Sequence, residues 1–172
     1  MSESPKVPSL RLEDAAWRDT PPDPLDDPAL YDGVAWRRVV AYGLDLMVLA
    51  VLGVCAWFVV GLIGILSFGL LAPLGAILLA ALPFAYHTLF LGARAATPGM
   101  RALDLEVRSW DGPRPDYLQA LAATVLFYAT IALTAWLILA VALFNDRRRT
   151  LHDYIAGTLV VRRSRIAQYP GA

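Results

Sequence analysis

The stretch Leu46–Leu66, LMVLAVLGVCAWFVVGLIGIL, contains no charged residue and decides the fold of this chain. A second stretch without a formal charge runs from Leu70 to Leu91, and only Ser67-Phe68-Gly69 separates the two. A helix needs about 20 apolar residues to cross a bilayer. The two stretches therefore predict a hairpin of membrane-spanning helices with a tight turn near Gly69, and Pro83 is expected to kink or loosen the second helix.

A third apolar run, Tyr117 to Phe144, has 28 residues and contains neither glycine nor proline. It predicts either a third long helix or a re-entrant pair of shorter helices. Arginines near span ends favour the cytoplasmic side. They precede the first span, lie in the 92–116 loop and follow the third run, which places the amino terminus and this loop inside. A single third crossing would put the last six arginines outside, whereas a pair keeps them inside but leaves only about 14 residues for each arm. We expect the carboxyl terminus inside.

Two segments on either side of the third run have the pattern of β-strands. Apolar and charged residues alternate over 103–107, which predicts a strand with one apolar face and one solvated face. Residues 158–161 form a second β-like run, and pairing of the two would place both on one side of the membrane. The chain is therefore expected to be an all-α integral membrane protein with short β-like segments at its inner face.

The first 33 residues differ from the rest in composition. They contain eight acids, three bases and six of the twelve prolines, which predicts a disordered tail. The expected division is a tail over 1–33, a membrane domain over 34–163 and a short carboxyl-terminal tail over 164–172. The single cysteine, Cys55, excludes an intrachain disulfide, and no zinc-ligand spacing occurs, so no metal site is expected.

Arg38 and Asp45 lie where the first span begins. They are seven residues apart, which puts them on one helix face about 11 Å apart along the axis, too far for direct pairing. Inside the membrane such groups face the protein interior or a water-filled path. Alternatively, the span begins at Leu46 and Asp45 is solvated among the headgroups. The spacing favours neither alternative.

Two histidines add to the polar residues near the inner face. His87 is expected to be a hydrogen-bonded packing residue rather than a ligand. His152 and Asp153 combine an imidazole with a carboxylate, which can relay protons or bind a cation, although neighbours on a helix point in different directions. Alternatively, Asp153 caps a short helix or pairs with the arginines at 147–149.

Three blocks of sequence together resemble the RDD family of bacterial membrane proteins. They are WRRVVAYGLD at 36–45, TPGMRALDLEV at 97–107 and RRRTLHDYIAGTLVV at 147–161. The resemblance covers residues 31–163 and implies that Arg38, Asp45 and Asp153 are the triad that gives the family its name. Met100 stands where a lysine is common in the family, and Asp104 stands where a glycine is common.

The polar residues favour a transport or ion-handling role. In that role Asp45 would bind a proton or cation, Arg38 would tune its pKa, and Asp153 would close the site from the inner side. So few helices rarely enclose a pathway, and a homo-oligomer is then expected. The alternative is a structural or assembly subunit, whose acidic tail would bind a partner protein.

Other classes of function lack a signature in the sequence. No nucleophile elbow or phosphate loop occurs, so we expect no enzyme, no catalytic residue and no cofactor. Nucleic-acid binding is not expected either, because membrane orientation already accounts for the arginines. The expected surroundings are the lipid bilayer of the bacterial cytoplasmic (inner) membrane, crossed several times, with the amino terminus in the cytoplasm.

Overall fold

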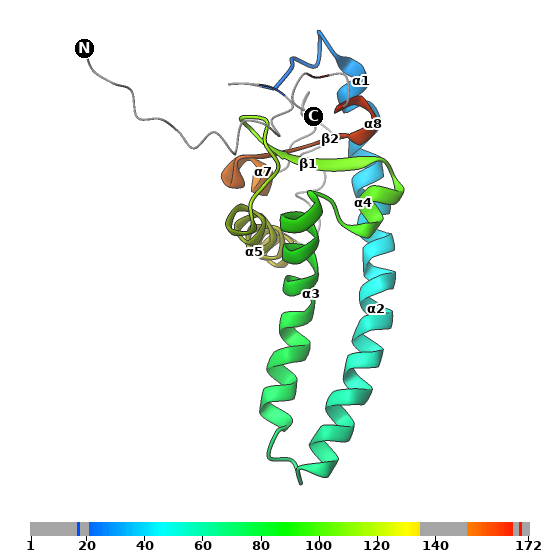
Figure 1. Ribbon diagram of the computed structural model, residues 1–172, viewed down its shortest axis with the longest axis vertical. Helices are drawn as coiled ribbons and strands as arrows, with labels where there is room; N and C mark the ends of the chain where they lie inside the picture. Colours follow the sequence, from blue (N-terminus) through cyan, green and yellow to red (C-terminus); the bar gives the residue numbers. More distant parts are fainter. Residues whose placement is uncertain (1–16, 18–20, 135–150, 167–168, 170–172) are drawn as a thin grey trace, which may run out of the picture.

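The computed structural model describes Trp17, residues 21–134, residues 151–166 and Tyr169. This part of the chain forms a long helical hairpin with a smaller cap over the open end of the hairpin (Figure 1). In chain order its elements are α1 (Pro28–Tyr31), α2 (Val34–Leu66), α3 (Ala72–Arg94), α4 (Pro98–Ala102), β1 (Leu105–Ser109), α5 (Tyr117–Thr134), α7 (Leu151–Ala156), β2 (Thr158–Arg162) and α8 (Arg163–Ile166).

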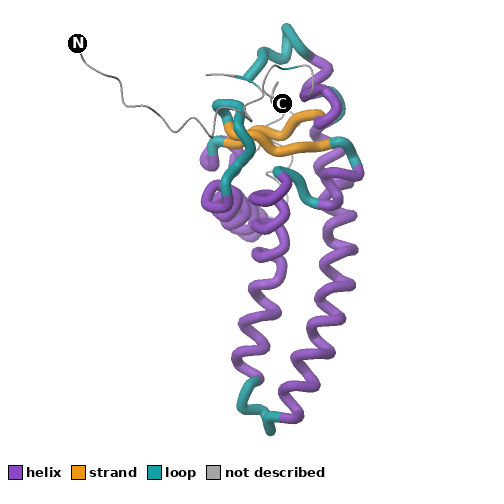
Figure 2. Tube along the Cα trace, in the orientation of Figure 1, coloured by secondary structure: helices purple, strands orange, loops and turns teal. Residues whose placement is uncertain are grey.

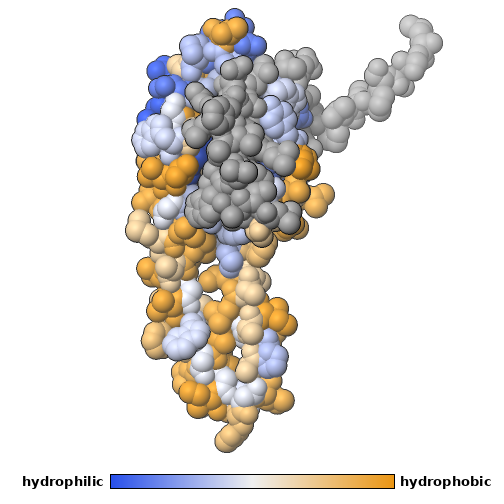
Figure 3. Space-filling view, turned by 180° about the vertical axis from the view of Figure 1, so that it is seen from behind, coloured by the Kyte–Doolittle hydropathy of each residue, from blue (hydrophilic) through white to orange (hydrophobic). Residues whose placement is uncertain are grey.

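The hairpin consists of α2 and α3, the two described helices that are long and apolar enough to cross a membrane. They have 33 and 23 residues, or about 50 and 34 Å of helix, against a hydrocarbon core of about 30 Å. The expected turn lies at Phe68 and Gly69, which both have positive φ. Apolar side chains cover the hairpin and polar ones collect at the cap (Figure 3). Because α2 begins at Val34, well before the apolar stretch, its first turns belong to the cap.

A two-stranded antiparallel sheet forms the middle of the cap (Figure 2). Val107 lies opposite Val160 in the register, and both pack into the core that joins the sheet to the hairpin. The expected solvated face of β1 is wrong, because every residue of the strand is buried. Its two charged residues, Glu106 and Arg108, form an ion pair of 2.8 Å. Glu106 and Arg108 lie opposite Val161 and Leu159 of β2, and the amino-terminal segment packs against those residues. Alternation within one strand cannot reveal such a cover.

The described part of the amino-terminal segment is folded onto the outer side of the sheet. Trp17, Leu30 and Tyr31 are buried in a second core with residues of β2 and α8, and the Trp17 indole donates to the carbonyl of Trp110 at 2.9 Å. For these residues the expectation of disorder is wrong, since aromatic and aliphatic side chains among the acids and prolines supply enough apolar surface to dock. Residues 1–16 and 18–20 lie outside the described part of the chain.

The third apolar run begins as α5, which packs against α3 and α7. In Figure 1 this helix recedes into the depth of the view, whereas α2 and α3 run along the vertical. It therefore crosses the hairpin direction instead of extending the bundle as a third parallel span. The remainder of the run, 135–144, lies outside the described residues, so the choice between one long helix and a re-entrant pair stays a prediction.

Candidate functional site

Arg38 of α2 and Asp153 of α7 form a buried ion pair. The guanidinium Nη1 lies 2.5 Å from one carboxylate oxygen, and Nη2 lies 3.2 Å from the other. Arg38 is 8% exposed and Asp153 is 3% exposed. A planar guanidinium and a carboxylate match each other in this two-bond geometry. The pair therefore fastens the first turns of the long helix to the short helix that follows the third apolar run.

Asp45 lies about two helical turns after Arg38 on α2 and has a different set of partners. Its carboxylate accepts hydrogen bonds from the Tyr86 hydroxyl at 2.8 Å, the Thr97 hydroxyl at 2.5 Å and the Gly99 amide at 2.9 Å. Asp45 is 2% exposed, so the alternative in which headgroup water solvates it is wrong. Within the described chain Asp45 forms no ion pair.

The three-residue sequence Thr97-Pro98-Gly99 has the local structure that these hydrogen bonds to Asp45 require. Thr97 caps α4 by accepting from the Met100 amide, and Pro98 occupies the first helical position. A Cβ on Gly99 would lie 2.2 Å from the carbonyl oxygen of Ala41, so only glycine brings this amide up to Asp45. The loop thus presents a hydroxyl and an amide to one buried carboxylate.

The expected triad is therefore two separate contacts on one helix face. Arg38 binds Asp153, while Asp45 binds α3 and the start of α4, as their spacing along the helix requires. Arg38 and Asp45 share no contact, and the arginine charge is paired with Asp153, so the expected influence of Arg38 on Asp45 stays a prediction.

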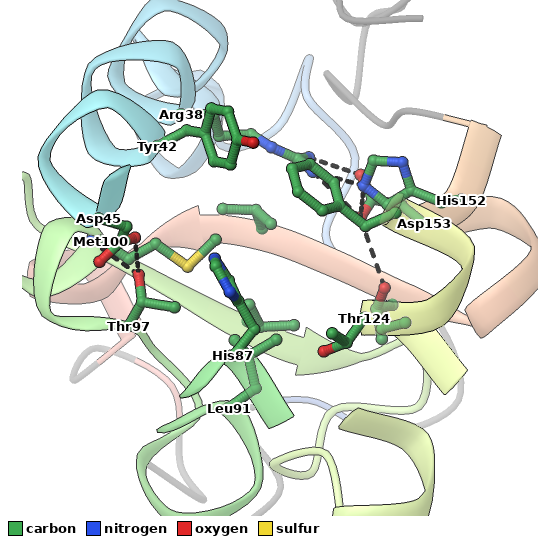
Figure 4. Close-up of a pocket in the computed structure, with 15 residues that line it drawn as sticks. Arg38, Tyr42, Asp45, His87, Leu91, Thr97, Met100, Thr124, His152 and Asp153 are labelled. Carbon is green, nitrogen blue, oxygen red and sulfur yellow. Dashed lines mark hydrogen bonds and ion pairs between the residues drawn. The ribbon is translucent and has the colours of Figure 1, made fainter. Parts of the chain in front are cut away.

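Both contacts border one partly open cavity of about 70 Å³ (Figure 4). Helices α2, α3, α4, α5 and α7 and both strands contribute to its walls, which are largely aromatic and aliphatic. The lining residues are Arg38, Tyr42, Asp45, His87, Leu91, Thr97, Met100, Val107, Ala123, Thr124, Phe127, His152, Asp153, Thr158 and Val160.

The two histidines border this cavity in different ways. His87 Nδ1 lies 3.0 Å from the Pro83 carbonyl and 3.1 Å from the Tyr128 hydroxyl. His152 Nε2 lies 3.4 Å from Arg38 Nη2, and it accepts in this contact because a guanidinium only donates. Burial lowers the pKa of His152 to about 4; Asp153 acts against this shift and Arg38 acts with it.

Outside the cavity, Asp104 shows how the chain tolerates its departure from the family pattern. Its φ is +61°, a conformation that favours glycine and that aspartate accepts more readily than most residues. The Asp104 carboxylate accepts hydrogen bonds from the Ser164 amide, the Ser164 hydroxyl and Arg162 Nε. Burial alone would raise the pKa of Asp104, but these hydrogen bonds hold it below its usual range.

Several residues that border the cavity were missed from the sequence. Tyr42, Thr124 and Phe127 occur in or next to apolar runs, where one aromatic or hydroxyl side chain resembles many others. Thr97 carried a usable signal, because a threonine before proline predicts a helix cap. Among the described residues no group of three His, Cys, Asp or Glu side chains is placed to hold a metal ion.

Comparison with known proteins gives one match. The family model described as RDD family matches residues 33–157, which is more than two thirds of the chain and includes Arg38, Asp45 and Asp153. No curated protein and no solved structure gives a significant match. The chain belongs to the RDD family, and with its two long apolar helices it is a membrane protein.

Proposed function

We propose that this protein binds and moves a monovalent cation or a proton, with Asp45 as the binding group. One observation carries the proposal. Asp45 is a buried carboxylate beside a cavity, and it forms no ion pair with any residue that the structure describes. Among the described residues that line the cavity, Arg38 is the one with a permanent positive charge, and Asp153 holds it in an ion pair.

A buried carboxylate in this state attracts positive charge. Removing an ionised carboxylate from water is costly unless a counter-charge or a proton compensates it. The three hydrogen bonds from Tyr86, Thr97 and Gly99 reduce the cost but carry no charge. A cation in the cavity, or a proton on Asp45, would neutralise the negative charge of the buried carboxylate. For this reason ionisable groups at membrane depth often mark ion pathways.

The proposal includes a topology. We place the cap and both termini on the cytoplasmic side of an inner membrane and the Phe68–Gly69 turn on the other side. The arginine distribution supports this orientation. The pairing of β1 with β2 supports a return of the third apolar run to the side on which it began. With few helices available, we propose that a homo-oligomer completes the pathway.

The topology is tested by labelling single cysteines in intact cells with a membrane-impermeant maleimide. In a Cys55→Ser background, Phe68→Cys at the fully exposed turn should be labelled and Arg165→Cys should not, until the cells are opened. Labelling of Arg165→Cys in sealed cells would refute the proposed location of the carboxyl-terminal part.

The function is tested with purified protein in proteoliposomes. A cation gradient should drive flux of the cation or of protons, and Asp45→Asn should reduce it at least tenfold. Asp111→Asn removes an exposed carboxylate far from the cavity and is the matched control. Equal flux through Asp45→Asn and unaltered protein, with both correctly folded, would defeat the proposal.

The alternative expected from the sequence, a partner-binding role for the acidic tail, gains no support from the described part of that tail. Trp17, Leu30 and Tyr31 are already buried against the chain itself. We therefore retain ion handling as the proposed function.

A further inference from the structure

The cavity beside Asp45 presents two polar atoms for which the described residues provide no hydrogen bond. Thr124 Oγ1 is buried without a hydrogen-bond partner, and Thr124 is 2% exposed. His87 Nε2 forms no hydrogen bond with the described residues, and the imidazole points into the cavity in Figure 4. Buried polar atoms are nearly always satisfied, so Thr124 Oγ1 indicates a ligand or water in the cavity that His87 also lines.

The contacts of His87 decide whether its Nε2 donates or accepts a hydrogen bond. A carbonyl oxygen only accepts, so the 3.0 Å contact with Pro83 requires the proton on Nδ1. Neutral imidazole then has a lone pair on Nε2. His87 Nε2 and the Asp45 carboxylate are thus both hydrogen-bond acceptors, and a ligand with several N–H donors would satisfy them.

The remaining walls favour a weakly hydrated cation. The rings of Tyr42 and Phe127 meet edge to face at 5.3 Å, and the Met100 thioether extends between Asp45 and His87 in Figure 4. Small hard cations such as Na⁺ or Mg²⁺ prefer a shell of oxygen ligands. Aromatic faces attract ammonium groups instead.

We infer that the cavity takes ammonium or a small primary alkylammonium ion, with His87 Nε2 and Asp45 accepting its N–H bonds and Tyr42 and Phe127 covering it. This inference rests on the proposed cation site and names its ligand. The size agrees, because a volume of 70 Å³ holds about five waters at roughly 10–15 Å³ each, comparable with an amine of a few heavy atoms.

The test measures ligand-dependent thermal stabilisation of the full chain in detergent at constant ionic strength. Methylammonium and ammonium should raise the melting temperature at concentrations at least tenfold lower than K⁺ or Na⁺. His87→Phe keeps an aromatic ring but removes the lone pair, and it should weaken the methylammonium response at least tenfold. Thr124→Val is the second variant, should His87→Phe fail to fold, and it should weaken the response severalfold.

A tethered amine provides an independent test at Met100. Met100→Lys would bring an ammonium group into the cavity, so it should raise the melting temperature and abolish the response to added methylammonium. Met100→Leu is the matched control and should keep the response.

The outcomes separate this inference from the proposed function. Equal responses to K⁺ and methylammonium that both depend on Asp45 would overturn the amine assignment and leave the cation site standing. A methylammonium response that His87→Phe and Thr124→Val leave unchanged would also overturn the assignment. Absence of any cation response, together with normal flux through Asp45→Asn, would overturn both.

Discussion

Neutralising Asp153 should destabilise this protein far more than its position on a six-residue helix suggests. Asp153→Asn keeps the shape of the side chain and removes its charge, so Arg38 is left buried with no counter-ion in the contact. Both partners are more than nine-tenths buried and share two hydrogen bonds. Breaking such a pair by removing one partner costs about 3–5 kcal/mol, or roughly two to four powers of ten in the folding equilibrium.

The size of the loss distinguishes a charge effect from a packing effect. If the cost arises from the stranded arginine, Arg38→Met combined with Asp153→Leu should restore stability to within about 1 kcal/mol of the unaltered protein. Folded fraction is followed by tryptophan fluorescence during denaturant titration in micelles. The unaltered protein, Arg38→Met, Asp153→Leu and the double variant form a double-mutant cycle. A loss below about 1 kcal/mol for Asp153→Asn, or simple additivity in the cycle, would refute the reasoning.

Three further predictions concern other parts of the cap. Burial holds the pKa of His152 at about 4 in the folded protein, below about 6.5 in an unfolded chain. Its contribution to stability is therefore present above pH 6.5 and lost as the pH falls toward 4. His152→Gln should reduce this pH dependence of the unfolding free energy, measured by denaturant titration. Gly99→Ala should cost about 1–3 kcal/mol in the same titrations, because its Cβ would meet the Asp45 side chain at 2.9 Å, whereas Gly53→Ala, with open space around it, should cost nothing measurable. Asp104→Ala should destabilise the chain by about 1 kcal/mol more than Asp104→Gly does, because alanine loses the same hydrogen bonds and also strains the positive φ; equal losses would show that strain is unimportant there.

The hairpin was predictable because membrane spans depend on local composition. Uncharged runs of about 20 residues have few alternatives to a spanning helix, and a glycine between them predicts the turn. The boundary at Asp45 was harder to predict. Whether a carboxylate at the end of an apolar run is solvated or buried depends on its partners, and Tyr86 and Thr97 are far from it in sequence.

The cap was predicted less well, because long-range pairing decides which faces of its segments are exposed. Alternation over 103–107 correctly indicates an extended segment, but the strand is offset to 105–109 because Asp104 forms the turn that leaves α4. The charged face of β1 is buried, and no pattern within five residues contains that information. Burial of the tail residues likewise requires knowledge of the sheet that they cover.

The resemblance to the family singled out Arg38, Asp45 and Asp153, and the geometry changes what they explain. A triad suggests one cluster, yet Arg38 and Asp45 are two turns apart on α2 and each is engaged by a different part of the chain. Arg38 with Asp153 accounts for how α7 is held to the long helix, which is a structural role that any well-packed replacement could fill. Asp45 is different, because three neutral donors hold a charge that they do not neutralise. An apolar residue would satisfy the packing there at lower cost, so the retained carboxylate in this chain is better explained by a positive charge that visits the cavity than by stability.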